Sequence, residues 1–476
     1  MRALGVGLVY WAALDPLLAP GGPAISVVEL EPQSLWEQAA DAAGWRYRGN
    51  EALLGRVAAL PQHKLLHGVG HPFGGTVRDP ADPLPLLRHA VDRLDPAWVS
   101  EHLSFNRVVR AGGFEHAGFL LPPPQSPAAV RVAAQNITGF RRALDRPVAF
   151  ETGVNYLRRR DGEMDDGDFF SAVALASGSG IVLDLHNLWC NERNGRETVA
   201  ATLARLPLER VWEIHLAGGM QQSGYWLDAH SGAVPPQVTD IAASLIPMLP
   251  NLGALIFEVL PEHLSRIGLD GVQRQIEDLQ RLWGLRPARV VQAPAASRLA
   301  FCNVEALPAD HVEVARWEST LVDILRTQAS LSSGFSDLRA DPGCGLLSEL
   351  IGDFRRASLA RALRYTMTCL LAGLGPHGTH ALLEAYFKTD APEPFAAVEA
   401  DRFARFLRTR LPLQPNIPQL EEVLAFEHAL LSATIHGASS EITWTVDPTM
   451  LFESLDAGEL PHDPPVVRSV MRICAN

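Results

Sequence analysis

Short apolar runs recur along residues 4–285, and each is followed by a polar or Gly/Pro break and then, in several cases, by an amphipathic stretch. Brief apolar runs bounded by breaks are typical of buried β-strands, whereas longer amphipathic stretches predict helices. Helices are predicted at 51–60, 127–144, 198–206 and 271–283. The predicted strands are 4–9, 25–30, 64–69, 97–103, 147–152, 180–185, 210–216 and 254–260.

Eight strands that alternate with helices favour a (β/α)₈ TIM barrel, a fold of about 250 residues, over an open doubly wound sheet. A dinucleotide-binding sheet would carry a Gly-rich phosphate motif after its first strand, and none follows residues 4–9. The predicted fold class is therefore α/β, with a barrel over residues 1–287.

The pattern changes after the barrel. Residues 288–300 fall in a stretch rich in proline and small residues, which predicts a linker. Residues 301–476 read as a smaller, mainly α-helical domain, with a flexible connection over 330–345 and a strand at 441–446 whose Ile442, Trp444 and Val446 share one face. Its predicted helices are 309–328, 359–374, 380–387, 396–410 and 419–434.

Composition narrows the class of partner. The net charge is −13, from 41 Lys and Arg against 54 Asp and Glu, so we expect no nucleic-acid partner. The five cysteines form no CxxC pair, which favours a reducing cytoplasm over a disulfide framework. No run approaches the ~18 apolar residues of a membrane span, and the first residues read as a core strand, so we expect a soluble cytoplasmic protein without a membrane partner.

Acidic, imidazole and amide side chains stand where the predicted strands end. Active sites of (β/α)₈ barrels gather at these ends. Each residue alone has an ordinary structural role open to it, such as a turn or an ion pair. Together they would place many polar groups at one barrel mouth with few Lys or Arg to neutralise them, which favours bound metal. The residues are His67, Glu101, His102, Glu151, Asp184, His186, Asn187, His215 and Glu258, with Asp228 and His230 in the loop after strand seven.

The donor types restrict the metal. Imidazole nitrogen with carboxylate and amide oxygen, and no thiolate, suits iron, manganese or zinc. The set is too large for one ion, so two or three ions with a bridging carboxylate such as Glu151 use it better. Zinc would favour hydrolysis or isomerisation and iron would favour dioxygen chemistry; spacing alone leaves both open. Strand alternation also predicts that Asp184 and His186 share one face, roughly 7 Å apart.

A family resemblance covers residues 4–285. The segments LLHGVG, SEHLSF, PVAFETGVNYL, LDLHNLWCN, EIHLAGG, LDAHSG and IFEVLPE resemble, in order, the motifs of the multinuclear non-haem iron-dependent oxidative enzymes of the methanobactin-biosynthesis type. The resemblance implies a (β/α)₈ barrel with two or three irons, mixed Fe(II)/Fe(III), that uses dioxygen to modify residues, most often cysteines, of ribosomally made precursor peptides.

The resemblance also implies the ligands. The sequence departs from the family motifs at His186, where the usual Asp-x-Asn-Asn motif has Asn, and at Thr152, where Asn is usual. Apart from Asn187, the implied ligands are also the expected catalytic residues. They are His67, His102, Glu151 (bridging), Asp184, Asn187, His215, Asp228, His230 and Glu258.

Residues 345–465 are similar to the helical partner protein with which family members capture the leader of the precursor peptide. The similarity implies a natural fusion, with a precursor peptide of leader and Cys-containing core as partner. The strand at 441–446 would accept the leader by β-augmentation, or the domain is a structural cap. Residues 112–124 read as a lid or a surface loop. The alternative to the oxygenase is a zinc-dependent TIM-barrel hydrolase or isomerase of the endonuclease or sugar isomerase kind, although a nuclease would need a basic rim.

Overall fold

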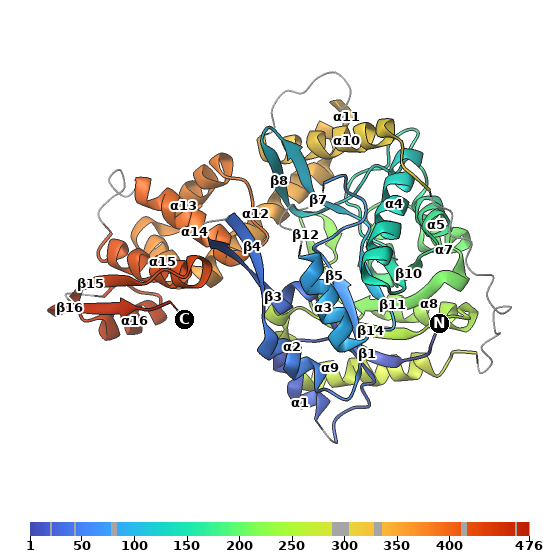
Figure 1. The fold of residues 1–476 in the computed structure, drawn as a ribbon, viewed down its shortest axis with the longest axis horizontal. Helices are drawn as coiled ribbons and strands as arrows, with labels where there is room; N and C mark the ends of the chain where they lie inside the picture. The colour runs from blue at the N-terminus through green and yellow to red at the C-terminus, as the bar shows by residue number, and fades with distance from the viewer. Residues whose placement is uncertain are drawn as a thin grey trace.

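The first part of the chain is a closed barrel of eight parallel strands (Figure 1). The computed structural model describes residues 1–19, 21–41, 44–77, 83–287, 304–327, 336–410, 417–461 and 464–475. Around the barrel the strand order is β1-β14-β11-β10-β9-β6-β5-β2, and all eight predicted strands are confirmed. The strands are β1 (Gly5–Val9), β2 (Val27–Leu30), β5 (His63–Gly68), β6 (Val99–His102), β9 (Val148–Glu151), β10 (Gly180–Asp184), β11 (Val211–Ala217) and β14 (Ala254–Glu258).

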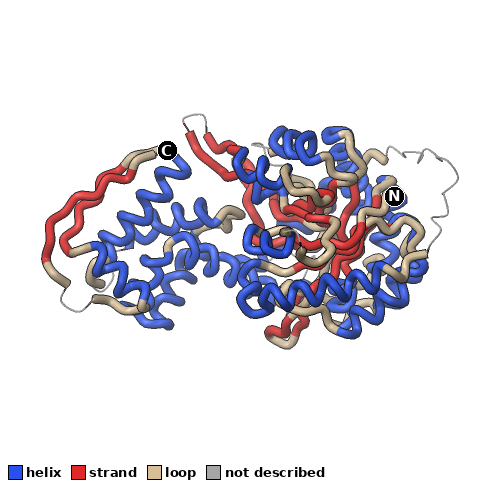
Figure 2. The backbone as a smooth tube through the Cα atoms, turned by 90° about the horizontal axis from the view of Figure 1, so that it is seen from below, coloured by secondary structure: helices blue, strands red, loops and turns tan. Residues whose placement is uncertain are grey.

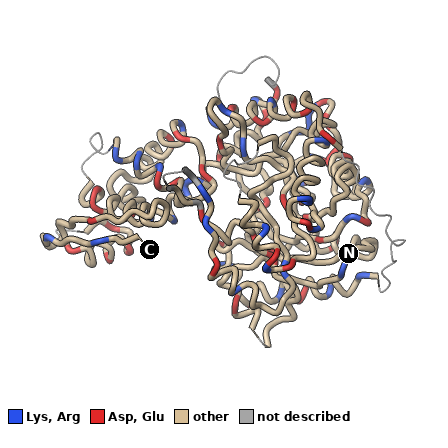
Figure 3. The backbone as a smooth tube through the Cα atoms, in the orientation of Figure 1, with Lys and Arg blue, Asp and Glu red and all other residues tan. Residues whose placement is uncertain are grey.

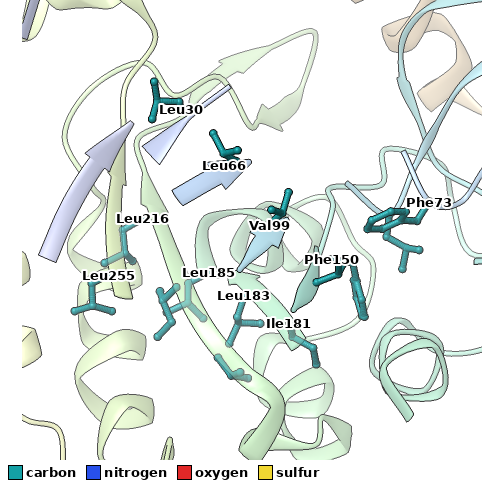
Figure 4. Packing of buried hydrophobic residues seen from close by; sticks show 14 of the residues in the cluster. Leu30, Leu66, Phe73, Val99, Phe150, Ile181, Leu183, Leu185, Leu216 and Leu255 are labelled. Carbon is teal, nitrogen blue, oxygen red and sulfur yellow. The ribbon is translucent and has the colours of Figure 1, made fainter. Parts of the chain in front are cut away.

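Helices surround the barrel, and Figure 2 shows its strands (red) enclosed by helices (blue). Outward-facing side chains such as Leu66, Leu183 and Leu255 pack between the strands and these helices (Figure 4). The predicted helices at 51–60, 127–144, 198–206 and 271–283 are confirmed, and they correspond to α2, α4, α7 and the second part of α9. The helices are α2 (Glu51–Ala58), α3 (Leu84–Leu94), α4 (Pro127–Leu144), α5 (Asp166–Ser177), α6 (Leu185–Arg193), α7 (Val199–Arg205), α8 (Pro236–Leu245) and α9 (Pro261–Trp283).

The inward-facing side chains form a separate apolar layer below the mouth of the barrel. Leu65, Ala149, Val182 and Ile256 belong to it. Because side chains two residues apart on a strand share a face, the next inward positions on these four strands are His67, Glu151, Asp184 and Glu258. The alternation that fills the barrel therefore also places polar residues at its carboxyl end.

Three antiparallel hairpins interrupt the barrel pattern. They are β3 (Trp36–Asp41) with β4 (Gly44–Gly49), β7 (Phe105–Arg110) with β8 (Gly113–Leu121), and β12 (Met220–Gln222) with β13 (Tyr225–Leu227). The expectation of a surface loop at 112–124 is wrong over residues 113–121, because β8 lies there and pairs with β7, whereas a lid role stays a prediction. Ala117 and Leu121 of β8 lie in a core with Leu321 and Leu347, and this packing holds the segment as a strand.

The region after the barrel is mainly helical, as predicted. The expected flexible connection at 330–345 is wrong for its described part, residues 336–345, because α11 and the start of α12 lie there. The predicted helix at 359–374 is divided between the end of α12 and the start of α13, and the predicted helix at 380–387 lies in α13, which is kinked at Gly375 with φ 68°. The elements are α10 (Pro308–Thr327), α11 (Ser336–Arg339), α12 (Pro342–Ala362), α13 (Arg364–Thr389), α14 (Ala396–Arg410), α15 (Leu420–His436), β15 (Ser440–Val446), α16 (Pro448–Asp456) and β16 (Val466–Ile473).

Two cores divide this helical region. Leu321 of α10 and Leu347 of α12 pack with the β7–β8 hairpin beside the barrel, whereas residues from Leu359 to Leu455 form a core of their own. The β3–β4 hairpin reaches from the barrel to α15 (Figure 1). The predicted linker at 288–300 lies outside the described residues, and the division at that linker stays a prediction.

The predicted strand at 441–446 is confirmed as β15, which pairs with β16. Ile442, Trp444 and Val446 are buried on one face, as predicted, against Phe426 and Phe452. Among the described helices, none combines the length and the apolar character that crossing a membrane requires. Basic and acidic positions are interleaved along the described backbone (Figure 3).

Candidate metal centre

Two histidines and one glutamate meet where three neighbouring strands end. Nε2 of His67 on β5 lies 2.7 Å from Glu151 Oε2 on β9, and Nε2 of His102 on β6 lies 3.2 Å from the same oxygen. The two imidazole rings are 4.6 Å apart between centroids. Glu151 and His67 are nearly inaccessible to solvent. All three residues are predicted ligands, and their donor atoms converge.

The opposite nitrogens of these histidines are held by barrel atoms. His102 Nδ1 lies 2.9 Å from the carbonyl oxygen of Gly68, and because a carbonyl only accepts, this nitrogen donates. His67 Nδ1 lies 2.9 Å from Ser100 Oγ. With the proton on Nδ1, the imidazole is neutral and the lone pair of Nε2 is available to bind a metal ion. Hydrogen-bond partners such as these fix the tautomer of metal-binding histidines. The barrel thus aims both Nε2 atoms at Glu151.

Asp184 and Asn187 stand at the junction of β10 and α6. Asp184 caps α6 by accepting a 2.6 Å hydrogen bond from the backbone N–H of Asn187, and the Asn187 amide nitrogen donates to Glu151 Oε1 at 3.1 Å. Asp184 Oδ2 and Asn187 Oδ1 are buried with no hydrogen-bond partner among the described residues. Buried acceptors without partners are costly, and two of them in one cluster fit a cation-binding site.

The prediction that His186 shares a strand face with Asp184 is wrong. The strand ends at Asp184, and α6 begins at Leu185, so His186 lies in the first turn of a helix. The cap made by Asp184 starts the helix one residue earlier than the apolar run suggests. His186 is fully buried, and its Nδ1 lies 3.4 Å from Asp228 Oδ1. It therefore stands behind a predicted ligand.

The remaining predicted ligands close the far side of the mouth. His230 Nε2 lies 2.9 Å from Asp228 Oδ1 and 3.3 Å from Glu258 Oε2. Glu258 Oε1 lies 3.2 Å from His215 Nδ1. His215 is flanked on its other side by Glu29 Oε1, 3.1 Å from Nε2. The structure thus brings all nine predicted ligands into one connected cluster; their role as ligands stays a prediction.

The charges of this cluster explain its pKa shifts. Burial raises the pKa of Asp184, and the nearby Asp228 and Glu151 raise it further. Burial works to raise the pKa of Glu258 as well, but His215 and His230 bring it down to about 2. Carboxylates that repel one another in a buried space are stabilised by a cation, since bound ions are the largest local charges in such sites.

Among the described residues, four sets of three place their donor atoms within 4.8 Å of one another. Glu151, Asp184 and His215 each belong to two of these sets, so neighbouring metal positions would share ligands. The donors are imidazole nitrogens and carboxylate oxygens, which suit iron, manganese or zinc. The sets are His67–His102–Glu151, Glu151–Asp184–His215, Asp184–Asp228–His230 and Glu29–His215–Glu258.

Two acidic residues of the site were missed by the sequence reasoning. Glu29 lies inside the apolar run of β2, and burial with the charge of Glu213 raises its pKa to about 7. Burial also raises the pKa of Glu31, which lies close to His67 and His102 and just before the β3–β4 hairpin. The sequence signal that could have identified Glu29 is a carboxylate at an inward position of an otherwise apolar strand, two residues after Val27. By contrast Glu101 accepts from the backbone N–H of His71 at 2.6 Å.

A model of a protein family matches much of the barrel. Residues 50–259 match the family described as RiPP precursor modification enzyme MbnB/TglH/ChrH. A UPF0276 protein of Caulobacter vibrioides is 30% identical over 227 residues, a match that covers 46% of this chain and 78% of the relative. The chain belongs to this family. The matched span contains all the predicted ligands.

A second relative has a higher identity over a shorter span. A UPF0276 protein of Chromobacterium violaceum is 38% identical over 187 residues, which cover 39% of this chain and 66% of that protein. Among solved structures, L-ribulose 3-epimerase is 14% identical, with a TM-score of 0.33, over 68% of this chain and 98% of that one. Such a likeness supports no conclusion about activity.

Proposed function

We propose that this protein is an iron- and dioxygen-dependent enzyme that oxidatively modifies residues, foremost cysteine, of a ribosomally made precursor peptide. Its family consists of RiPP precursor modification enzymes, which supports peptide modification. The observation that carries a metal-dependent reaction is the pair of buried acceptors, Asp184 Oδ2 and Asn187 Oδ1, which face no partner among the described residues. Bound iron would supply dioxygen binding and one-electron oxidation.

Two or three irons, mixed Fe(II)/Fe(III), would share the nine ligands. His67, His102 and Glu151 would hold one ion, and Glu151 would bridge to a second. His230 and Asp228 would hold a third together with Asp184. His215 and Glu258 would complete the set, and Asn187 would contribute its amide oxygen.

The chain itself would orient these ligands. Gly68 and Ser100 hold the Nδ1 atoms of His102 and His67, so neither imidazole has to reorganise when metal binds. Glu29 Oε1 lies 3.1 Å from His215 Nε2, on the side of the ring opposite to Nδ1, which lies 3.2 Å from Glu258 Oε1. The mouth lies above an apolar layer that includes Leu65 and Val182, and this layer excludes water from below.

The helical region would recruit the peptide through the β15–β16 sheet. The backbone N–H of Thr445 on β15 already donates to Glu422 at 3.1 Å, which occupies part of that edge. On β16, Val466 and Val470 are 91% and 64% exposed, unusually high for valine in a strand. An extended leader added to the edge of β16 would cover them. We place the activity in the cytoplasm, where the cysteines described as free thiols would stay reduced.

The test is anaerobic reconstitution of the metal-free protein with Fe(II), followed by metal analysis and Mössbauer spectroscopy. Dioxygen uptake and the mass of a Cys-containing peptide encoded beside the gene are then measured. We expect bound iron, peptide-dependent dioxygen uptake and a mass change located at cysteine.

Two variants make the result specific. Glu151→Gln should abolish modification and lower iron content, because it removes the shared carboxylate. Glu318→Gln changes another buried glutamate on α10, and should leave both unchanged. Stoichiometric zinc without iron, combined with no dioxygen uptake for any such peptide, would contradict the proposal.

A further inference from the structure

A line of aromatic rings leads away from the cluster on the side of Asp228. His186 lies 3.4 Å from Asp228, and its ring centroid is 5.7 Å from that of Trp189, one turn further along α6. Trp189 packs edge-on against Trp226 of β13, with centroids 4.8 Å apart. Trp189 is buried and Trp226 is half-buried, so the line runs from the cluster to solvent.

Several features show that these rings are held in place. The backbone N–H of Trp226 donates to Asn194 Oδ1 at 2.9 Å, and the Asn194 amide donates back to the Trp226 carbonyl. Gly219 leaves room for His186, because a Cβ at Gly219 would come within 2.5 Å of the imidazole. His186 is also the position at which the chain departs from the motif of the family it resembles.

We propose that His186, Trp189 and Trp226 conduct oxidising equivalents from the metal cluster to the protein surface when no peptide is bound. This proposal rests on the proposed function, because dioxygen at the iron cluster supplies the oxidant. Indole is among the side chains most easily oxidised by one electron, and contact between the rings shortens each transfer. Dioxygen activated without substrate would otherwise attack the ligands themselves.

Trp226 gives one electron, which passes through Trp189 and His186 and reduces the oxidised cluster by one electron. The indole N–H proton of Trp226 goes to water and leaves a neutral tryptophanyl radical. A small cytoplasmic thiol then transfers a hydrogen atom to the ring, and two of the resulting thiyl radicals join as a disulfide.

Arg193 sets the threshold of this path. Its guanidinium lies 5.6 Å from the centre of the Trp189 ring and 5.9 Å from that of Trp226. A fixed positive charge over both rings disfavours the tryptophan radical cation. Only a strong oxidant would draw an electron through these rings, so normal turnover on the peptide would lose no oxidising equivalents by this path.

A second pair of rings provides the alternative route. Tyr156 Oη accepts from the backbone N–H of Asp228 at 3.1 Å, and Tyr225 lies 6.2 Å from Tyr156 between centroids. Because the Tyr156 oxygen already accepts from a backbone N–H, which withdraws electron density from the phenol, oxidation by this route is disfavoured.

The experiment exposes the iron-loaded full chain to dioxygen without peptide. Freeze-quench electron paramagnetic resonance detects radicals, and peptide mapping by mass spectrometry locates oxidised side chains. We expect a tryptophanyl radical and oxidation concentrated at Trp226. In Trp226→Phe that radical should be lost, and oxidation should move to Trp189 and the ligands, with several-fold faster loss of the cluster's absorption spectrum.

Trp283→Phe is the matched control. Trp283 is also half-buried and lies under a guanidinium, that of Arg286 at 4.0 Å, but it stands on α9 away from the line of rings. Oxidation spread equally over Trp226 and Trp283, oxidation at Tyr225 instead, or an unchanged radical in Trp226→Phe would overturn the proposal.

A second arm separates this proposal from the proposed function. Copper(II) bound by the same nitrogen and oxygen donors generates an oxidant at the cluster with hydrogen peroxide, whatever the native metal. If the dioxygen arm fails and the peroxide arm still oxidises Trp226, the proposed function is wrong and the path stands. If the peroxide arm spares Trp226, the path is wrong.

Discussion

Asp184 accepts a hydrogen bond from the backbone N–H of Asn187 with one carboxylate oxygen, while its other oxygen is buried without a partner among the described residues. One side chain therefore caps a helix and faces the proposed metal cluster. The two roles can be separated, because an amide caps a helix about as well as a carboxylate.

Asp184→Asn should keep the cap and lose the ligand charge. We expect the free energy of unfolding of the metal-free protein to change by less than about 1 kcal/mol. Substitution of residues that hydrogen-bond to metal ligands lowers metal affinity about 10–100-fold, so loss of a charged ligand should lower it at least as much. Chelator competition measures the affinity and urea unfolding the stability. Unchanged iron affinity in this variant would show that Asp184 only caps α6.

Glu29→Gln tests whether a residue behind the ligands orients them. The variant keeps the size of the side chain but removes the charge beside His215 Nε2. We expect the affinity for iron to fall about 10–100-fold. Glu318→Gln, a buried change on α10, is the control and should leave the affinity unchanged. Equal affinity in both variants would remove Glu29 from the site.

The barrel could be predicted from the sequence because its strands are continuous apolar runs. The run at 180–185, for example, supplies both faces of a parallel strand, and the strand itself ends in the polar Asp184. That combination located the strands and the mouth together. β8 was mistaken for a loop because it begins with Gly113 and is only partly buried, and because Leu321 and Leu347, which pack with it, lie far along the chain.

The site was predicted where polar residues end strands and missed where they lie inside them. Glu29 sits within β2, so nothing local distinguishes it from a buried partner of an arginine. His186 was placed on a strand because helix initiation by Asp184 depends on a single cap hydrogen bond rather than on hydrophobic periodicity. The contact between Glu29 and His215 joins segments that are distant in sequence and depends on closure of the barrel.

Glu318 should make the stability depend on pH. Burial raises its pKa to about 7, although it accepts hydrogen bonds from the backbone and hydroxyl of Thr76. The folded pKa lies above the ordinary value of 4.5, so the folded state binds the proton more tightly. This contribution is fully present below about pH 4.5 and is lost as the pH rises through 7.

The size of the effect is up to about 3 kcal/mol, at about 1.4 kcal/mol per pKa unit. Glu318→Gln stays neutral, so the stability of the native sequence relative to this variant should decline between pH 5 and 8. Urea unfolding in the presence of chelator at several pH values measures the difference. A difference that does not vary with pH would show that Glu318 titrates normally.

A buried ion pair should stabilise the helical region. Arg355 Nε lies 2.7 Å from Glu399 Oε1, and both side chains are almost fully buried. The guanidinium also stacks 4.3 Å from the ring centre of Phe387. Glu399→Ala would leave a buried charge without its counterion, which costs about 3–5 kcal/mol.

An exposed pair provides the comparison. Arg472 and Glu441 lie 2.6 Å apart with side chains 71% and 56% exposed, so Arg472→Ala should cost no more than about 1 kcal/mol. Thermal unfolding followed by circular dichroism ranks the two variants. Similar losses in both would mean that the Arg355–Glu399 pair is not required to hold α12 against α14.

Val470 tests the proposed peptide edge. Its side chain on β16 is 64% exposed, and a leader strand docked at this edge would bury part of it. Replacing valine by glutamate removes about 1.5 kcal/mol of apolar burial, so Val470→Glu should weaken binding of a synthetic leader peptide about tenfold. Isothermal titration calorimetry gives the dissociation constants.

Met450→Glu is the matched control for this prediction, because Met450 is 47% exposed on α16 and also belongs to the helical region. Both substitutions lie on the surface and should change the free energy of unfolding by no more than about 0.5 kcal/mol. A loss of affinity in Val470→Glu alone would place the leader on β16. If neither variant changes the affinity for the leader peptide, β-augmentation at this edge is contradicted. If both variants lower the affinity equally, the cause is a charge effect spread over the whole helical region.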